Sequence, residues 1–201
     1  MKEFKFKKID AFATMKSDGN PAGYIHLDSM ESINESEMLR IARELKGFVS
    51  EVGYISKIDE TTFSLRYYSS EREVDFCGHA TVAIMYDIIK NTSSLIKEKE
   101  INIITNKGQL IVENHIKSDD AVFIMSPVPE FRTKKIKKED VAKAMDISAS
   151  AISDEFEISV VNGGLETLIV PINSLDSILN IDPDLNTLKT FCVNNGVDIV
   201  E

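Results

Sequence analysis

A cysteine, a glycine and a histidine stand together near the middle of the chain, directly before a strongly apolar run. These residues are Cys77, Gly78 and His79, and the run is Val82-Ala83-Ile84-Met85-Tyr86. A segment that is apolar around most of its circumference is typical of a helix buried on all sides. We therefore expect a buried helix over about 79–91, with a thiol and an imidazole at its beginning.

The beginning of such a helix is suited to binding an anion. Free backbone amides there point outward and carry partial positive charge. A carboxylate can therefore dock at Gly78 beside His79, and the same field favours a neutral imidazole. The competing interpretation is structural, with the His79 ring bonded to a nearby carbonyl and Cys77 serving as a small buried apolar side chain.

Glu51 is the second residue with a chemical use. In the expected strand 49–56, the period of two places Glu51 on the same face as Val49 and Ile55. Burial on an apolar face raises the pKa of a carboxyl group toward neutrality, where it can act as acid or base. The alternative is a glutamate at a strand edge, bonded to a neighbouring lysine.

The elements that must position these groups mix strands and helices without regular βαβ alternation. Helices are expected at 34–47, 79–91, 139–145, 174–179 and 185–193. Strands are expected near 3–12, 22–27, 49–56, 62–68, 101–105, 109–114, 121–125, 157–162 and 167–171, with a last apolar segment at 197–200. The sharpest local signal is Asn34 as N-cap with Glu37 as its capping-box partner. This pattern favours an α+β fold over a doubly wound sheet.

Composition narrows the possible partners. The 201 residues are 43% hydrophobic, enough for one domain or two small ones, and the net charge of −10 argues against nucleic acid or an anionic membrane as partner. The first residues lack the apolar core of a signal peptide, and no segment reaches the length of a membrane span. Two cysteines in such a chain indicate reduced thiols and a cytoplasmic location. Neither His26 nor His115 has another ligand at helical or hairpin spacing, so we expect no metal site.

Three motifs, taken in order, resemble those of the PhzF-like family of phenazine-biosynthesis isomerases and epimerases. They are Gly19-Asn20-Pro21-Ala22-Gly23, then Ser50-Glu51, then Leu65-Arg66-Tyr67 leading to Glu73-Val74-Asp75-Phe76-Cys77-Gly78-His79-Ala80-Thr81. The resemblance covers nearly the whole chain, more loosely after Asn114. It implies the diaminopimelate epimerase-like fold, in which two similar domains each wrap a curved mixed sheet around a central helix. The expected domains are 1–114 and a partial second domain, 115–201.

The resemblance also implies roles for individual residues. Glu51 would move a proton at carbon without a metal or other cofactor, and His79 with the Gly78 amide would bind or polarise an acidic or carbonyl group. The other substrate-binding positions implied by the motifs are Asn20, Ser50 and Asp75. The expected substrate is a small carboxylic acid, and the expected assembly is a homodimer.

Two departures from the family pattern leave alternatives open. The position of the catalytic cysteine six residues beyond the first cysteine of the epimerase motif is Ala83 here, which disfavours a racemase that uses Cys77 and Cys192. The late Asp-Pro-Ala-Thr-Gly-like motif has no match, since Asp182-Pro183 supplies only its first two letters. We therefore expect an incomplete second domain, and the alternative to an isomerase is a catalytically silent binding protein or an inactive fragment.

Overall fold

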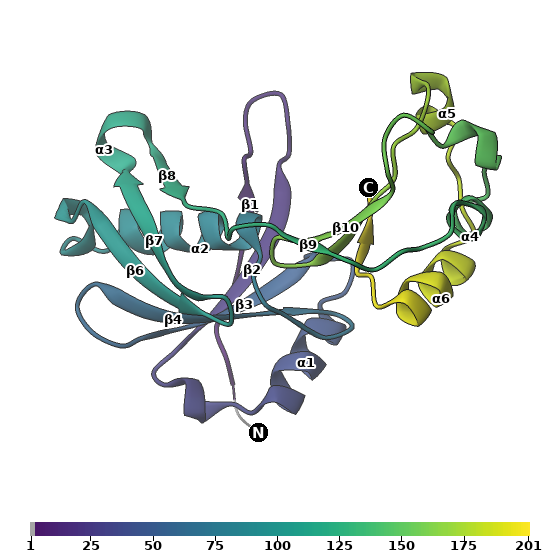
Figure 1. Cartoon of the computed structure of the whole chain (residues 1–201). Coiled ribbons are helices and arrows are strands. Elements are labelled where there is room, and N and C mark those ends of the chain that lie inside the picture. The colour runs from purple at the N-terminus through teal and green to yellow at the C-terminus, as the bar shows by residue number, and fades with distance from the viewer. Residues whose placement is uncertain (1–2) are drawn as a thin grey trace. The chain divides into compact units, whose positions relative to one another are not determined.

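The computed structural model describes residues 3–201 and divides into two compact units. The first unit ends at Ser126 and is built on one mixed sheet (Figure 1). Its strands are β1 (Phe6–Ala11), β2 (Asn20–Leu27), β3 (Glu51–Lys57), β4 (Thr62–Ser69), β5 (Glu73–Val74), β6 (Glu100–Thr105), β7 (Gly108–His115) and β8 (Ala121–Ile124). The order is β1-β2-β3-β4-β6-β7-β8, with β5 beside β4. β2 pairs with β3 and β4 with β6 in parallel, and the other pairs are antiparallel.

Helix α2 (Gly78–Asn91) is the central helix of this unit and contacts β1, β2, β3 and β8. Seven of its side chains are buried, as its apolar sequence requires: Ala80, Thr81, Ala83, Ile84, Met85, Ile88 and Ile89. The helix lies against β3 because Gly53 has no side chain. A Cβ at Gly53 would lie 2.3 Å from Cδ1 of Ile84, which is itself only 1% exposed. This close approach holds α2 against the strand that carries Glu51.

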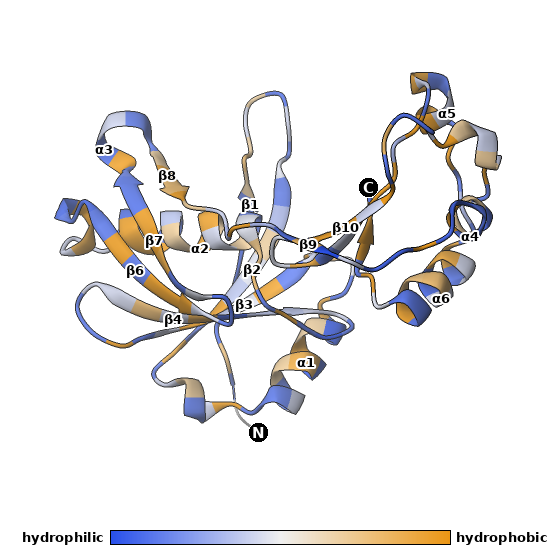
Figure 2. Cartoon of the chain, viewed as in Figure 1, coloured by the Kyte–Doolittle hydropathy of each residue, from blue (hydrophilic) through white to orange (hydrophobic). Residues whose placement is uncertain are grey.

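The other helices of the first unit are short and cover its margins: α1 (Glu35–Glu44), α3 (Ile116–Asp119) and the 3-10 turns η1 (Met30–Ser32) and η2 (Leu95–Lys97). The expected capping box is confirmed, because Glu37 N–H donates to Asn34 at 2.9 Å and Asn34 N–H donates to the Glu37 carboxylate at 3.2 Å. Met38 and Ala42 bury one side of α1 in a core that includes Tyr54 and Tyr68. Along β6 the apolar Ile101 and Ile103 are buried, whereas β7 has an apolar run at 110–112 that is followed by hydrophilic residues at 113–115 (Figure 2).

The second unit, Pro127–Glu201, has its own four-stranded sheet in the order β12-β11-β10-β9. Its elements are β9 (Glu130–Arg132), α4 (Lys138–Ala144), η3 (Ala149–Ala151), β10 (Ser159–Asn162), β11 (Glu166–Ile169), α5 (Leu175–Leu179), α6 (Leu185–Asn195) and β12 (Ile199–Val200). Its core contains Val141, Ile152, Val160 and Leu168. β12 is parallel to β11, so this sheet is also mixed.

The division between the units differs from the expected boundary after residue 114. β8 pairs with β7, with His115 opposite Ala121, so the residues up to Ser126 belong to the first unit. The single turn α3 was not expected, because four residues are too few to show a helical period. β9 was not among the expected strands either, because its three residues are too few to show the alternation of a strand. Within residues 3–201, no helix is long and apolar enough to cross a membrane.

Candidate active site

Glu51, Cys77 and His79 come together at the beginning of α2. His79 Nε2 lies 3.3 Å from Glu51 Oε2, and His79 Nδ1 lies 3.3 Å from Cys77 Sγ. Both side chains of the Glu51–His79 pair are largely buried, with 18% and 15% of their surface exposed. Within residues 3–201, Glu51 Oε2 and His79 Nε2 have no hydrogen-bond partner. The two groups that the sequence singled out are therefore in contact, and both retain bonding capacity for a ligand.

A chain of hydrogen bonds fixes the beginning of the helix. Thr81 Oγ1 donates its proton to the Cys77 carbonyl at 2.7 Å, so the Tyr67 hydroxyl, 2.5 Å away, must donate to Thr81. Tyr67 and Thr81 are fully buried, where an unmade hydrogen bond is costly. The main chain at Cys77 is thus tied to β4, and the direction of the first turn of α2 is set.

Burial shifts the pKa values of this site in opposite directions. Desolvation raises the pKa of Glu51, and this effect exceeds the opposing influence of the nearby His79 ring and the hydrogen bond from Cys77. Desolvation lowers the pKa of His79, against the opposing effects of the Glu51 carboxylate and the Pro21 carbonyl. The neutral imidazole expected from the helix field is therefore favoured mainly by burial. A carboxyl group that holds its proton more tightly beside a neutral imidazole is a suitable acid/base pair.

The order of contacts, thiol to imidazole to carboxylate, also resembles a nucleophilic triad. The thiol environment argues against that use, because burial and the neighbouring Glu51 carboxylate raise the pKa of Cys77 to about 12. A nucleophilic cysteine needs a lowered pKa, since the thiolate is the reactive form. Cys77 is only 7% exposed, in agreement with the interpretation of a buried, unreactive side chain.

The structure brings some of the other predicted site residues toward this pair. β2 pairs with β3 so that Ala22 lies opposite Glu51, and Asn20 is two residues before Ala22 on the same face. Asn20 is exposed at the beginning of its strand. A Cβ at Gly78 would meet only Phe76, at 3.8 Å, so space is open beside the Gly78 main chain.

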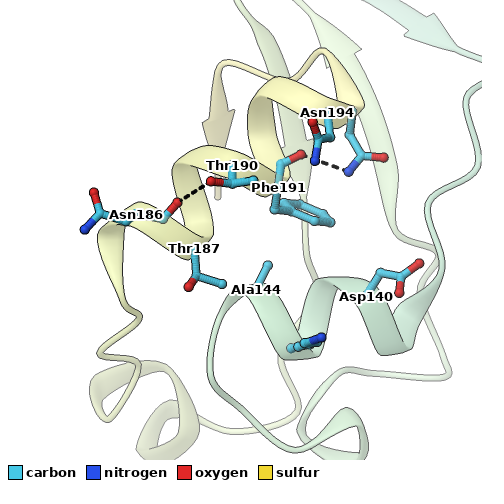
Figure 3. A pocket seen from close by; sticks show the side chains of 9 residues that line it. Asp140, Ala144, Asn186, Thr187, Thr190, Phe191 and Asn194 are labelled. Carbon is cyan, nitrogen blue, oxygen red and sulfur yellow. Dashed lines mark hydrogen bonds between the residues drawn. The ribbon is translucent and has the colours of Figure 1, made fainter.

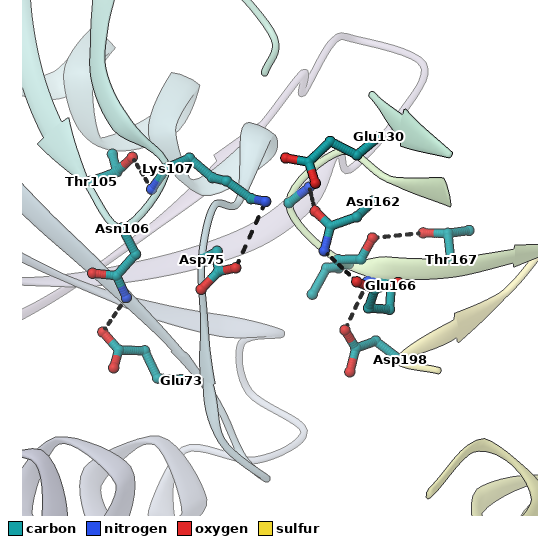
Figure 4. Close-up of polar contacts among 12 residues, drawn as sticks. Glu73, Asp75, Thr105, Asn106, Lys107, Glu130, Asn162, Glu166, Thr167 and Asp198 are labelled. Carbon is teal, nitrogen blue, oxygen red and sulfur yellow. Dashed lines mark hydrogen bonds and ion pairs between the residues drawn. The ribbon is translucent and has the colours of Figure 1, made fainter. Parts of the chain in front are cut away.

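Ser50 and Asp75 make other contacts. The Ser50 N–H donates to the Pro21 carbonyl at 3.3 Å, and Ser50 lines a separate hollow with Lys46 and Phe48. The Asp75 carboxylate is 49% exposed and lies 3.9 Å from the ammonium group of Lys107 (Figure 4). Pro21 was the position that sequence reasoning missed. The motif predicted a role for Asn20, whereas the Pro21 carbonyl is the group whose hydrogen bond acts to raise the pKa of His79.

A cavity of about 840 Å³ opens beside the beginning of α2, within the first unit. Gly78, His79 and Val82 line one wall, and residues of β1 and β8, including Ala11 and Val122, line others. The walls are mostly apolar, as is usual in small-molecule sites, where a few polar groups fix orientation. The volume is sufficient for a small organic acid.

A groove in the second unit contains none of the motif residues. It has a volume of about 460 Å³ and lies between α4 and α6, around Phe191 (Figure 3). Its lining side chains are mainly amides and hydroxyls on α6, such as Asn186, Thr190 and Asn194. The polar contacts of the second unit in Figure 4, in which Glu166 accepts from Asn162 at 2.9 Å, tie its strands together.

Replacing Glu51 by Gln is expected to raise the melting temperature at neutral pH. The folded-state pKa of Glu51 lies above its ordinary value of 4.5, so the folded protein binds this proton more tightly than the unfolded chain does. The stabilisation from this group is present below pH 4.5 and is lost as the pH rises through the folded pKa. Thermal unfolding of both proteins across this range should therefore show a gain that is small below pH 4.5 and grows above it.

Glu113→Gln is the matched control for that measurement. Glu113 Oε2 also lies 3.3 Å from a histidine Nε2, that of His115, but these side chains are 56% and 39% exposed. Solvated charge pairs contribute little to stability, so the free energy of unfolding of this variant should stay within about 1 kcal/mol of the parental value at every pH. An equal gain in both variants would mean that burial of Glu51 is not the cause.

The sequence comparisons identify relatives along almost the whole chain. A family model described as Phenazine biosynthesis-like protein (PhzC-PhzF) matches residues 9–200. An uncharacterized isomerase of Clostridium acetobutylicum is 28% identical over 94% of this chain and 62% of its own length. An uncharacterized isomerase of Bacillus subtilis is 31% identical over 92% of this chain and 61% of its own length. The chain thus spans about three fifths of the length of these curated relatives.

The comparison with solved structures gives the same answer for the fold. A Bacillus anthracis phenazine biosynthesis protein of the PhzF family superimposes with a TM-score of 0.74 at 24% identity, covering 99% of this chain and 66% of that one. The expected α+β fold of diaminopimelate epimerase type, with curved mixed sheets and helices, is confirmed. By its family match, its isomerase-named relatives and its fold, the chain belongs to the PhzF-like phenazine biosynthesis-like family.

Proposed function

We propose that this chain supplies the acid/base pair of an isomerase or epimerase that moves a proton at carbon in a small carboxylic acid. The observation that carries the proposal is the contact of Glu51 Oε2 with His79 Nε2 at 3.3 Å, both atoms buried and without a hydrogen-bond partner among residues 3–201. Buried polar atoms are normally satisfied, and an exception in a native structure points to a ligand, a water or a catalytic role.

The chemistry follows from the two protonation states. As a carboxylate, Glu51 removes a proton from a carbon next to a carbonyl or carboxyl group, and the C–H electron pair moves into that group. The neutral His79 imidazole and the outward N–H of Gly78 stabilise the negative charge that develops on oxygen. Glu51, now a carboxylic acid, delivers the proton to a second carbon on the same face of the substrate, which completes an isomerisation; an epimerisation would need a second acid on the opposite face to protonate the original carbon. Atoms and charge balance without a redox step, as in a cofactor-independent isomerisation.

The raised pKa of Glu51 supports this role. A general acid or base works best when its pKa lies near the working pH, and burial moves this carboxyl group in that direction. The largely apolar cavity, which His79 and Gly78 line and which Glu51 reaches through its contact with His79, provides space for the carbon skeleton. Asn20, on the same face of the sheet as Glu51, is positioned to contact a polar group of the substrate.

Deuterium incorporation tests the proposal directly. The chain is incubated in D₂O with a panel of small α-amino, α-hydroxy and unsaturated carboxylic acids, and each acid is followed by proton NMR and mass spectrometry. We expect at least one acid to lose a single C–H signal and gain one mass unit, only when protein is present. Failure of every acid to exchange would contradict proton transfer at carbon.

A carboxylate-binding protein without turnover is the second candidate. The observation that favours it is the amide-bearing start of α2 beside a cavity, an arrangement that binds an anion without any chemistry. Calorimetry with the same panel separates the two functions, because binding without deuterium exchange supports only this one. The homodimer and the cytoplasmic location expected from the sequence remain predictions, and light scattering of the purified protein would check the first.

A further inference from the structure

The cluster at the beginning of α2 contains one group that proton transfer does not use, the thiol of Cys77. Glu51, Cys77 and His79 each offer a ligand atom, and these three atoms all lie within 4.8 Å of one another. In a tetrahedral zinc site, with bonds of 2.0–2.3 Å, neighbouring ligand atoms are about 3.3–3.6 Å apart. The Glu51–His79 separation of 3.3 Å already meets that value. The remaining adjustment is a side-chain shift on the order of 1 Å.

The chemistry of the three groups selects the kind of ion. A thiolate with an imidazole and a carboxylate suits zinc and chemically similar transition metals, whereas magnesium and calcium prefer oxygen ligands only. Two of the ligand atoms, Glu51 Oε2 and His79 Nε2, are buried and lack hydrogen-bond partners within residues 3–201. A cation between them would satisfy both at once.

We propose that Glu51, Cys77 and His79 form a three-ligand binding site for a thiophilic divalent cation, with Zn²⁺ as the test ion, which competes with proton transfer. On binding, the Cys77 thiol loses its proton to solvent, the carboxylate and one imidazole nitrogen donate lone pairs, and the fourth position is left for water. Metal binding does not depend on the proposed isomerase function. The inhibition rests on that function, because the ion would occupy Glu51 Oε2.

Cobalt spectroscopy tests the site without any activity assay. The parent protein for the experiment is the Cys192→Ser variant, in which Cys77 is the single thiol. We expect Co²⁺ to give a near-ultraviolet thiolate-to-cobalt charge-transfer band and Zn²⁺ to abolish it by competition. Adding Cys77→Ser should remove the band and weaken Zn²⁺ binding by at least roughly 100-fold, since losing even a partner of a ligand typically costs 10–100-fold.

His115→Gln on the same parent is the matched control. His115 contacts Glu113 and Asp119 at 3.3 and 3.2 Å on the surface, so it is a competing place for an ion without a thiol. Its loss should leave the charge-transfer band unchanged. No band in the parent, or a band that persists after Cys77→Ser, would overturn the proposal.

A second variant covers the case in which Cys77→Ser does not fold. Glu51→Gln on the same parent should keep the charge-transfer band, because the thiolate remains, but should weaken Zn²⁺ binding by roughly tenfold or more. Unchanged affinity in that variant would exclude Glu51 as a ligand and overturn the three-ligand site. The metal site is tested by the charge-transfer band and by Zn²⁺ affinity, whereas the isomerase proposal is tested by deuterium exchange in metal-free buffer. The failure of one proposal can therefore be distinguished from the failure of the other.

Discussion

Glu51→Gln is expected to slow solvent-deuterium incorporation by roughly 10²–10⁴-fold, the usual contribution of a positioned general acid or base. Glutamine keeps the size of the side chain and can accept a hydrogen bond, but it cannot take a proton from carbon. The rest of the site, including the Tyr67–Thr81 bond to the beginning of α2, is untouched. The measurement is the initial rate of C–H signal loss in D₂O with an acid on which the parent protein acts.

Two controls make that result specific to proton transfer. Substrate affinity, measured by calorimetry, should change far less than the exchange rate, because Glu51 acts on the reacting carbon. Glu113→Gln, which alters the equivalent contact on the surface, should exchange at the parental rate. Exchange at the parental rate in Glu51→Gln would remove this residue from the mechanism.

The local parts of the site were predictable from the sequence, and their contact was not. The period of two placed Glu51 on an inner face, and the apolar run after His79 indicated a buried helix, which begins at Gly78. Their contact depends on the packing of α2 against β3, where Gly53 admits Ile84. Strand pattern and helix pattern each describe one element, so neither pattern reports on a distance between elements.

The same limit applies to the expectation that no metal site is present, which stays a prediction. That expectation considered ligands at helical or hairpin spacing, and it examined His26 and His115. Glu51 is far from Cys77 and His79 in the sequence, and only the fold brings their ligand atoms within 4.8 Å. The family motifs also did not predict that Ser50 lines a hollow with Lys46 and Phe48, or that Asp75 contacts Lys107.

The site is a region where stability and chemistry are opposed. The Glu51 carboxyl group and the His79 imidazole are both partly desolvated at the beginning of α2. Desolvation makes their charged forms less favourable, and the shifts in their pKa values result from this energetic cost. The surrounding structure compensates through the buried Tyr67 and Thr81 bonds and through close packing of α2. A stabilising Glu51→Gln variant that has lost exchange would be the expected signature of a group retained for function.

His79→Gln is expected to lower the exchange rate by roughly 10²–10³-fold, the cost of removing one preorganised donor to a developing oxyanion. The glutamine amide can still donate a hydrogen bond, but it is shorter than the imidazole and lacks the 3.3 Å contact of Nε2 with Glu51. Steady-state rates should show the loss mainly in kcat, because the donor acts where negative charge develops. His115→Gln, on the surface beside Glu113, is the control and should retain the parental kcat.

The pH profile of His79→Gln distinguishes a catalytic role from a structural one. The protonated form of the His79 ring, which becomes populated toward acidic pH, lowers the pKa of Glu51, so removal of the ring should raise that pKa further. If Glu51 is the base, exchange rises as Glu51 loses its proton, and the acidic limb of kcat/KM should therefore move to higher pH in the variant. A variant that had merely lost packing would show a lower rate with the limb in its parental place, and that outcome would separate His79 from the proton-transfer pair.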